Sequence, residues 1–281
     1  MSEFSRLSRR GLLRAGAVGA IGAGVAGSGL LGTAAHADND DGMLYIPPSI
    51  PYGVLSPTEK SFNNIDGTPT MYIRDGSGVR KPATFRCTFG FYDALVAWVQ
   101  RLRSVSASQG YPGLSFLTSA GAYVNKAGQH GAGTAYDCDE IGWSDGRMSR
   151  MIGLDWQTSK PSDVRKRYYA VDATLRAHFH WCLDRTYNSA HHDHIHADFG
   201  GMPVKLNKGS SSDVGFIQAI CNEFMNSGLA VDKIWGPLTQ AAFDQSRSRL
   251  GVTSGDPHSS TAVYRTYLDA VARKGFANQA F

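Results

Sequence analysis

Four of the nine histidines in this chain lie within six residues, in the segment 191–196 with the sequence His-His-Asp-His-Ile-His. Imidazole is the commonest protein ligand for transition metals and the side chain that most often transfers protons near neutral pH. If the end of this segment is a strand, His194 and His196 project from the same face, because side chains alternate along a strand. Two imidazoles on one face are half of a metal site, so the other ligands should come from elsewhere in the chain.

A second group of potential ligands lies upstream, where His130 and Asp137 flank a glycine-containing stretch. Gly131 and Gly133 permit a tight turn that can bring both side chains to one point. Together with His196 they would supply two imidazoles and one carboxylate and leave a fourth position for water. Such an open set is typical of catalytic zinc, whereas structural zinc is closed by four ligands, often cysteines. Zinc bound there lowers the pKa of its water to about 7.

The same residues also fit less specific interpretations. His130 fits an ordinary loop histidine, Asp137 beside Asp139 fits a turn cap, and a histidine run fits a surface loop that binds metal adventitiously. A second H-x-H pair, His178 and His180, serves as an internal comparison. It falls in a predicted helical stretch, where residues two apart diverge by roughly 200°, so we predict a structural role for it. Spacing alone does not define a site; the strand context does.

The hydrophobic pattern in the middle of the chain predicts an α+β domain. Apolar residues recur at helical spacing over 91–102, and two short buried strands are expected at 114–118 and 134–138. A second helix is expected to begin near Ser162 or Asp163 as N-cap. The apolar stripe expected on that helix comprises Val164, Tyr168, Val171, Leu175 and Cys182. The histidine cluster then follows as a loop and a strand.

A composition shift after Gly200-Gly201 indicates a linker over residues 204–212, rich in Gly, Ser and Lys. Beyond it, residues 213–281 are predicted to form a small module of three helices. These are expected to cover 214–224, to begin at Gly236-Pro237 with the proline in the first turn, and to cover 263–271.

Residues 1–37 are predicted to be an export signal. They contain the twin arginines Arg9 and Arg10, a Gly/Ala-rich apolar stretch and the cleavage pattern Ala35-His36-Ala37. A membrane anchor is the alternative, but glycines dilute the apolar run. Residues 38–86, rich in Pro, Gly, Asn and Asp, are expected to form an extended segment with room for a hairpin.

The formal net charge of +4 belongs mostly to the predicted signal. Residues 1–37 hold four basic residues and one acidic residue, so 24 basic and 23 acidic residues remain and the charge becomes +1. No Lys/Arg-rich run is left, and we therefore expect no nucleic-acid partner. No second apolar stretch is long enough to span a membrane, so we expect no membrane association after signal cleavage.

Four cysteines, an even number in a protein expected to be exported, suggest two disulfides. They are Cys87, Cys138, Cys182 and Cys221. Three connectivities are possible, and the sequence does not choose among them. The lack of a C-x-x-C pair argues against a structural zinc site.

The two histidine motifs carry a resemblance to a known family. The pattern H-x-x-G-x-A-x-D at 130–137 followed by D-H-x-H at 193–196 resembles the zinc D-Ala-D-Ala peptidases and murein endopeptidases of the Hedgehog/DD-peptidase fold. The closer resemblance is to the extensin-like C-terminal domain family, bacterial relatives of those peptidases. Its further segments are Gly142-Trp143-Ser144-Asp145-Gly146-Arg147, Asp155-Trp156 and the stretch 187–198. The resemblance implies a zinc domain over 87–203 with a small antiparallel sheet and flanking helices.

The resemblance also implies roles for individual residues. His130, Asp137 and His196 would bind Zn²⁺. His194 would stabilise an oxyanion or transfer a proton. His191 stands where the D-Ala-D-Ala peptidases have a general-base glutamate, as in the murein endopeptidase branch. Which of these two histidines is the base stays open.

Two departures from the peptidase pattern affect the expected reaction. Gly128 replaces a serine two residues before the first histidine, and no S-G-Y-R-like segment supplies a substrate-binding arginine; Ser119-Ala120-Gly121-Ala122-Tyr123 stands near that place. A carboxypeptidase that clamps a free terminal carboxylate is therefore less favoured than an endopeptidase.

The C-terminal module resembles the three-helix peptidoglycan-binding domain over residues 231–243, with Lys233 in place of its usual glycine. An unrelated helical cap is the alternative. A wall-binding module beside a wall peptidase would raise the local concentration of enzyme at the polymer.

From these observations we expect a protein of the cell wall, secreted by the twin-arginine pathway, that hydrolyses amide bonds in peptidoglycan stem peptides or cross-links with Zn²⁺. One alternative is a non-catalytic peptidoglycan-binding protein with a structural metal site. Another is a metallohydrolase of a non-peptidoglycan peptide. The bond that is cleaved and the oligomeric state do not follow from the sequence.

Overall fold

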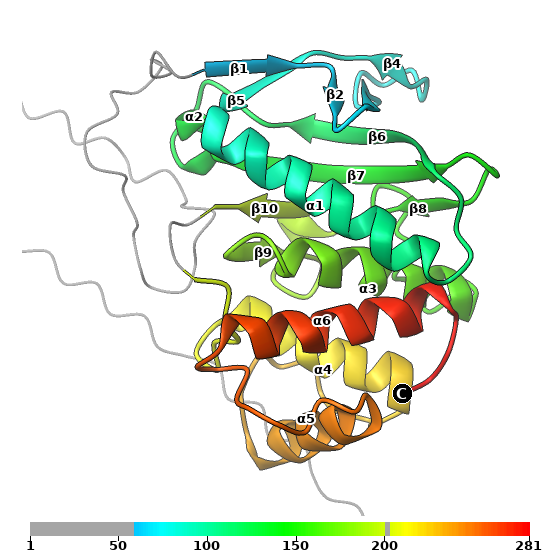
Figure 1. Cartoon of the computed structure of the whole chain (residues 1–281), viewed down its shortest axis with the longest axis vertical. Coiled ribbons are helices and arrows are strands. Elements are labelled where there is room, and N and C mark those ends of the chain that lie inside the picture. Colours follow the sequence, from blue (N-terminus) through cyan, green and yellow to red (C-terminus); the bar gives the residue numbers. More distant parts are fainter. Residues whose placement is uncertain (1–58, 200–202) are drawn as a thin grey trace, which may run out of the picture. The chain divides into compact units, whose positions relative to one another are not determined.

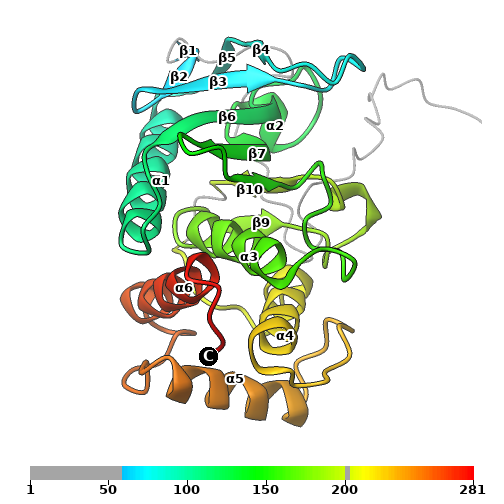
Figure 2. The ribbon, with the colours of Figure 1, turned by 90° about the vertical axis from the view of Figure 1, so that its right-hand side faces the viewer.

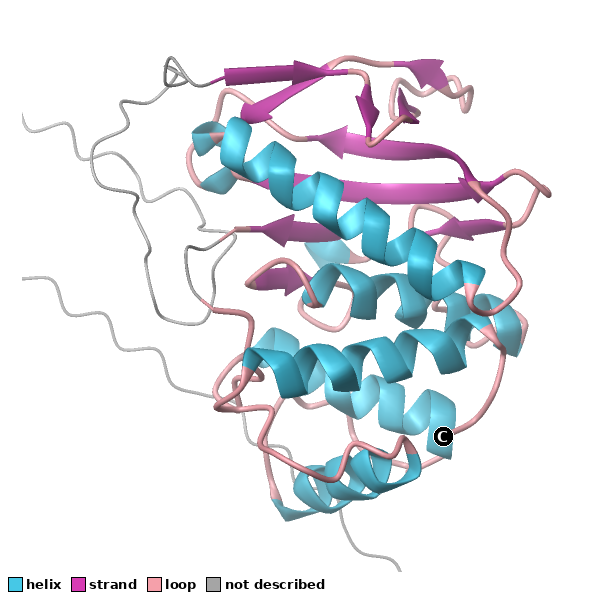
Figure 3. Cartoon of the chain, viewed as in Figure 1, coloured by secondary structure: helices cyan, strands magenta, loops and turns pink. Residues whose placement is uncertain are grey.

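The computed structural model describes residues 59–199 and 203–281. The predicted export signal and the first part of the extended segment lie outside the described residues. Within the described ranges, no helix is both long enough and apolar enough to cross a membrane. The α+β class expected from the hydrophobic pattern is confirmed, with six α-helices and a mixed sheet in this part of the chain (Figures 1 and 3).

Short strands occupy the described part of the segment that was expected to be extended. They are β1 (Glu59–Phe62), β2 (Asn64–Ile65), β3 (Thr68–Tyr72), β4 (Lys81–Pro82) and β5 (Phe85–Thr88). Asp66 and Gly67 both have positive φ, 51° and 78°, which suits the two-residue turn between β2 and β3. The hairpin for which the sequence left room is therefore present.

The main sheet has eight strands. Its later strands are β6 (Leu114–Gly121), β7 (Ala135–Trp143), β8 (Met148–Arg150), β9 (Trp181–Leu183) and β10 (Ile195–Asp198). The path of the sheet runs β2-β3-β6-β7-β10-β9 (Figure 2), while β4 pairs with β3 and β8 pairs with β7. The two strands expected at 114–118 and 134–138 are confirmed as β6 and the start of β7.

The expectation of a small antiparallel sheet was wrong in one respect, because β3 and β6 pair in parallel. Parallel neighbours need a long crossover, usually a helix. Here the chain between β3 and β6 includes α1 (Phe89–Ala107). The prediction missed this pairing because β3 was not resolved from the extended segment in the sequence.

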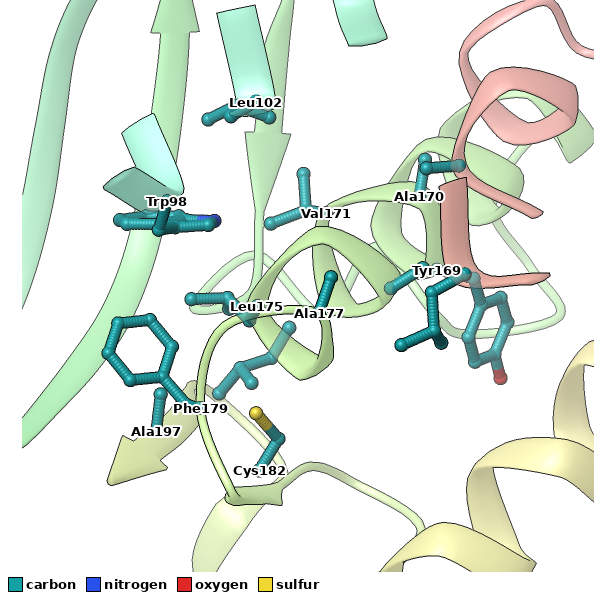
Figure 4. Close-up of a cluster of buried hydrophobic side chains, with 14 of the residues drawn as sticks. Trp98, Leu102, Tyr169, Ala170, Val171, Leu175, Ala177, Phe179, Cys182 and Ala197 are labelled. Carbon is teal, nitrogen blue, oxygen red and sulfur yellow. The ribbon is translucent and has the colours of Figure 1, made fainter. Parts of the chain in front are cut away.

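Helices α1 and α3 (Ser162–Arg176) pack on one face of the sheet (Figure 2). The indole of Trp98 on α1 lies 6.0 Å from the ring of Tyr136 on β7 and donates a hydrogen bond of 3.1 Å to Thr174 on α3. Ala197 on β10 joins the same core (Figure 4). Since side chains alternate along strands, the neighbours Asp137 and His196 must point to the opposite face.

Helix α3 differs from the expected helix in detail. Its N-cap is Pro161, one residue before the expected position, and the helix ends at Arg176. Cys182 therefore does not belong to its apolar stripe; it lies on β9. The pair His178 and His180 also lies beyond the helix end, so the helical geometry expected for this pair was wrong.

His178 and His180 nevertheless have separate partners. The Nε2 atom of His178 accepts a hydrogen bond of 2.7 Å from Arg101. The ring of His180 lies 4.7 Å from that of Trp181, and its Nδ1 is 3.0 Å from the carbonyl oxygen of Pro203. The two imidazoles thus have different structural partners and do not form one site together.

His178 should make stability depend on pH. Burial and then the charges of Arg101 and Arg265 lower its pKa to about 3, whereas the unfolded chain binds this proton at a pKa of about 6.5. As pH falls below 6.5, His178 becomes protonated in the unfolded state but stays neutral in the folded state. The free energy of unfolding should therefore decrease towards pH 3. We expect a His178→Gln variant, which keeps an acceptor for Arg101, to show a shallower decrease. Urea denaturation at pH 7.5, 6 and 5 checks this; identical slopes would contradict it.

The three helices expected at the C-terminus are confirmed as α4 (Ser211–Met225), α5 (Pro237–Arg249) and α6 (Thr261–Phe276). Helix α6 packs closely on α3. A Cβ atom on Gly275 would lie 2.5 Å from the backbone oxygen of Lys166, so only glycine permits this approach. The division of the chain at residues 204–212 stays a prediction.

The two disulfides suggested by the cysteine count are absent, and all four cysteines are free and buried. The register explains this for one pair. Cys138 on β7 and Cys182 on β9 lie on either side of β10, opposite Ile195 and Ala197. Two strand spacings of about 4.8 Å each exceed the Cα separation of about 4.4–6.8 Å that a disulfide needs. Cys87 and Cys221 lie on β5 and α4.

Candidate metal centre

Strands β7 and β10 bring Asp137 and His196 together. The two residues are direct cross-strand partners in the antiparallel register, on the sheet face away from α1 and α3. The Nδ1 atom of His196 lies 2.9 Å from Oδ1 of Asp137. The strand expected at the end of the histidine cluster is present as β10, but it begins at Ile195, so it includes His196 and not His194.

The third ligand comes from the short helix α2 (Gln129–Ala132), just before β7. The Nε2 atom of His130 lies 3.1 Å from Oδ1 of Asp137 and 3.2 Å from Nδ1 of His196. Gly131 is required here, because a Cβ atom would lie 1.8 Å from the backbone oxygen of Lys126. The turn expected from the glycines thus brings His130 onto the strand pair.

His130, Asp137 and His196 form a group that could hold a metal ion. Their ligand atoms all lie within 4.8 Å of one another, and this is the one such group in the residues that the structure describes. Two imidazole nitrogens and a carboxylate oxygen suit zinc and several other divalent transition metals. The residues present therefore fit a metal ion, whose identity the donor set does not fix.

Contacts behind the ligands hold both imidazoles in position. The Nδ1 atom of His130 lies 2.5 Å from the carbonyl oxygen of Ala122. The Nε2 atom of His196 lies 3.4 Å from a carboxylate oxygen of the buried Asp198. Protons on these outer nitrogens leave the inner nitrogens as ligands, which is the usual arrangement around metal-bound histidine. Neither Ala122 nor Asp198 was assigned a role from the sequence.

Electrostatics favour a cation at this point. Burial alone would raise the pKa of Asp137, but the charge of His130 and hydrogen bonds from both imidazoles hold it well below its usual range. Burial would lower the pKa of His196, yet its hydrogen bonds with Asp137 and Asp198 raise it to about 10. The group thus stabilises positive charge, and a bound metal ion would replace the proton.

His194 lies at the open side of this group. Its Nε2 atom is 3.8 Å from Oδ1 of Asp137. The side chains of Asp137 and His194 are 14% and 15% exposed, whereas those of His130 and His196 are 1% exposed. Solvent therefore reaches the group from the side of Asp137 and His194.

The other two histidines of the cluster differ from each other. The ring of His191 is buried, 5.1 Å from that of His194 and 6.0 Å from that of His196. Its Nδ1 atom lies 2.8 Å from the side-chain oxygen of Asn188. His192 is exposed, with Nδ1 2.6 Å from the carbonyl oxygen of Ser189. The structure thus brings His191 to the site.

Arg74 connects the site to the N-terminal strands and was missed in the sequence. It donates two hydrogen bonds, of 2.7 and 3.0 Å, to the carboxylate of Asp139. It donates another, of 2.8 Å, to Asp193, whose other oxygen lies 2.9 Å from Nδ1 of His194. The chain Arg74–Asp193–His194 therefore orients Nε2 of His194 towards Asp137. No motif around residue 74 signalled this role.

Replacement of Arg74 by methionine should disturb the site without changing any candidate ligand. Because Arg74 contacts none of the three candidate ligands, we expect metal affinity to fall by less than the roughly 10–100-fold that follows the loss of a residue hydrogen-bonded to a ligand. The ring resonances of His194 should shift, since its partner Asp193 loses its cation. Arg80 is the matched control, because it pairs in the same bidentate way with Glu140 on β7, a carboxylate that Arg150 also binds. Metal titration and the His194 ring resonances of both variants check this; His194 resonances in the Arg74→Met variant that match those of the Arg80→Met variant would contradict it.

Comparison with known families matches part of the chain. Residues 91–205 match the family model described as the extensin-like protein C-terminus. This stretch contains His130, Asp137 and His196 as well as His191 and His194, so the resemblance is confirmed here. Neither the curated proteins nor the solved structures yielded a match. The Hedgehog/DD-peptidase fold and the peptidoglycan-binding nature of the C-terminal helices stay predictions.

Proposed function

We propose that this protein is a zinc-dependent hydrolase of the cell wall, secreted by the twin-arginine pathway, that cleaves amide bonds in peptidoglycan stem peptides or cross-links. The observation that carries the proposal is the convergence of His130, Asp137 and His196 with His194 at the solvent-reached side. A closed structural site would have a fourth protein ligand in place of an opening that solvent reaches beside His194.

His130, Asp137 and His196 would hold the metal through one nitrogen or oxygen each. When bound, zinc lowers the pKa of a coordinated water to about 7 and polarises a carbonyl oxygen. Asp137 and His196 stand on paired strands, and the outer nitrogens of His130 and His196 already contact Ala122 and Asp198. The ligands thus need little rearrangement, which favours catalysis by preorganisation.

His194 is the proposed proton-transfer group. Asp193 accepts from its Nδ1 atom and Arg74 holds Asp193 in place, so Nε2 faces the space beside Asp137. In that position Nε2 can take a proton from the attacking water or stabilise negative charge on the carbonyl oxygen. His191, whose ring packs beside that of His194, is the second candidate for the proton.

Two observations bear on the substrate. The side chains of Ile234 and Leu238 are 66% and 77% exposed, within the segment 231–243 that resembles the peptidoglycan-binding core. Two exposed apolar side chains this close in the sequence support a docking surface for a polymer on this segment. Arg74 is committed to Asp139 and Asp193, so it does not supply the clamp for a terminal carboxylate, which supports an endopeptidase.

Digestion of purified sacculi by the zinc-loaded protein, with the product masses read out, tests this function. Conversion of cross-linked dimers to monomers is expected for an endopeptidase, whereas loss of a terminal residue would indicate a carboxypeptidase. The His194→Ala variant should lose activity by roughly 100–10,000-fold, the usual contribution of a proton-transfer group. His192→Ala, a change of the exposed neighbour, should not. Binding to sacculi without new muropeptides would contradict the proposal and support a non-catalytic wall protein.

A further inference from the structure

A cavity of about 580 Å³ lies outside the metal centre, between α3, α4 and the loop that follows β8. Six of its lining residues are Trp156, Gln157, Tyr169, Arg185, Asn222 and Glu223. The volume is in the range of small-ligand sites, roughly 300–1,000 Å³. Trp156 belongs to the Asp155-Trp156 segment noted in the sequence, for which the proposed reaction has no use.

Arg185 lines this cavity with its guanidinium between two aromatic rings and with one polar atom lacking a hydrogen-bond partner. Its guanidinium lies 5.0 Å from the ring centre of Trp156 and 5.6 Å from that of Tyr169, and it donates a hydrogen bond to the Tyr169 hydroxyl. Its Nε atom is buried without a hydrogen-bond partner. Within the described ranges, no carboxylate lies at ion-pair distance from Arg185, and the buried Asp184 interacts with it only through its charge.

The carboxylate that lines the cavity, Glu223, is not an ion partner of Arg185 either. Glu223 accepts a hydrogen bond of 2.8 Å from Arg165 and forms an ion pair with it. The amide of Asn222 is likewise used, because it binds both backbone groups of Leu229. A partly buried guanidinium whose Nε atom has no hydrogen-bond partner is costly, and an anionic ligand in the cavity would reduce that cost.

We infer that this cavity binds a carboxylate-bearing ligand through Arg185, with the ring of Trp156 as an apolar wall. The planar guanidinium matches a carboxylate in two parallel hydrogen bonds. The Nε1 atom of Trp156 donates a hydrogen bond of 2.7 Å to the backbone oxygen of His192, so the wall of the cavity is joined to the loop between His191 and His194. The cavity therefore takes the acidic part of a peptide whose scissile bond lies at the metal centre. This identification of the ligand rests on the proposed function.

Binding of a purified disaccharide-tetrapeptide muropeptide tests the inference, with the same compound amidated at its carboxyl groups as comparison. The titration is done with chelator present, so that no turnover occurs, and is followed by calorimetry and by the indole N–H resonance of Trp156. We expect amidation or Arg185→Met to weaken binding by roughly tenfold or more, with a shift of the Trp156 resonance by the acidic compound only. Arg147→Met is the matched control, because Arg147 also lies over an aromatic ring, that of Tyr111, away from the cavity.

Equal affinity for the acidic and amidated compounds, or unchanged binding by Arg185→Met, would overturn the inference. Thermal unfolding of Arg185→Met and Arg185→Lys shows whether each variant is folded. Failure of the proposed function gives a different pattern, in which the acidic compound still binds through Arg185 but zinc-loaded protein releases no muropeptide. If the Arg185→Met variant cleaves its substrate with an unchanged KM, the inferred binding site is contradicted while the proposed function stands.

Discussion

Replacement of Asp137 by alanine is expected to weaken zinc binding by more than roughly 100-fold, because even the loss of a residue that only hydrogen-bonds to a metal ligand weakens binding by roughly 10–100-fold. Asp137 is the one carboxylate of the group, and its Oδ1 atom lies within 3.1 Å of both imidazole ligands. Its removal leaves His130 without a neighbouring anion and His196 with Asp198 alone. Competition with a chromophoric chelator measures the change.

Asp145→Ala is the control for the loss of an acidic side chain. Asp145 is exposed, pairs with Arg147 at 2.6 Å and lies in the turn after β7. We expect this variant to bind zinc as tightly as the unaltered protein. If Asp137→Ala also retained full affinity, the metal would have to bind elsewhere, for example at the exposed His192.

Replacement of Arg176 by methionine should lower the free energy of unfolding by about 3–5 kcal/mol, the usual cost of removing one partner from a buried ion pair. The side chain of Arg176 is 2% exposed and binds Asp172 at 2.8 Å and Asp213 at 3.0 Å. It also donates to the hydroxyl of Ser212 and the backbone oxygen of Cys182. This one guanidinium thus joins α3, β9 and α4, and its loss leaves buried carboxylates without a cation.

Urea denaturation measures this change, with Arg86→Met as control. Arg86 pairs with Glu59 at 3.0 Å, but the two side chains are 50% and 29% exposed, so its loss should cost no more than about 1 kcal/mol. Similar losses in both variants would show that the buried network contributes little beyond an ordinary surface pair. Arg176→Lys should lie between the two, because lysine keeps the charge but cannot reach all four partners.

The elements that the sequence predicted are those with a clear hydrophobic period. The spacing of Phe91 to Leu102 predicted α1, and the proline of Gly236-Pro237 marked the start of α5. The three proposed ligands could be named because their types and the glycines between His130 and Asp137 restricted the choice. The resemblance to the extensin-like family then assigned them to one site.

Other features depended on contacts that the sequence does not contain. Arg74 reaches Asp139 and Asp193 only because β3 pairs in parallel with β6, and that pairing has no local signal. Likewise, the cysteine count suggested disulfides, but β10 separates Cys138 from Cys182. Register and strand order decide both cases, and both arise from packing of the whole sheet.

The most direct test of the central claim is the rate of muropeptide release measured against the amount of bound zinc per chain. The account predicts that release from sacculi stops when a chelator removes the metal and returns in proportion to zinc added back. His194→Ala should bind zinc normally and still release muropeptides slowly. Release at an unchanged rate by the chelated, metal-free protein would contradict the account.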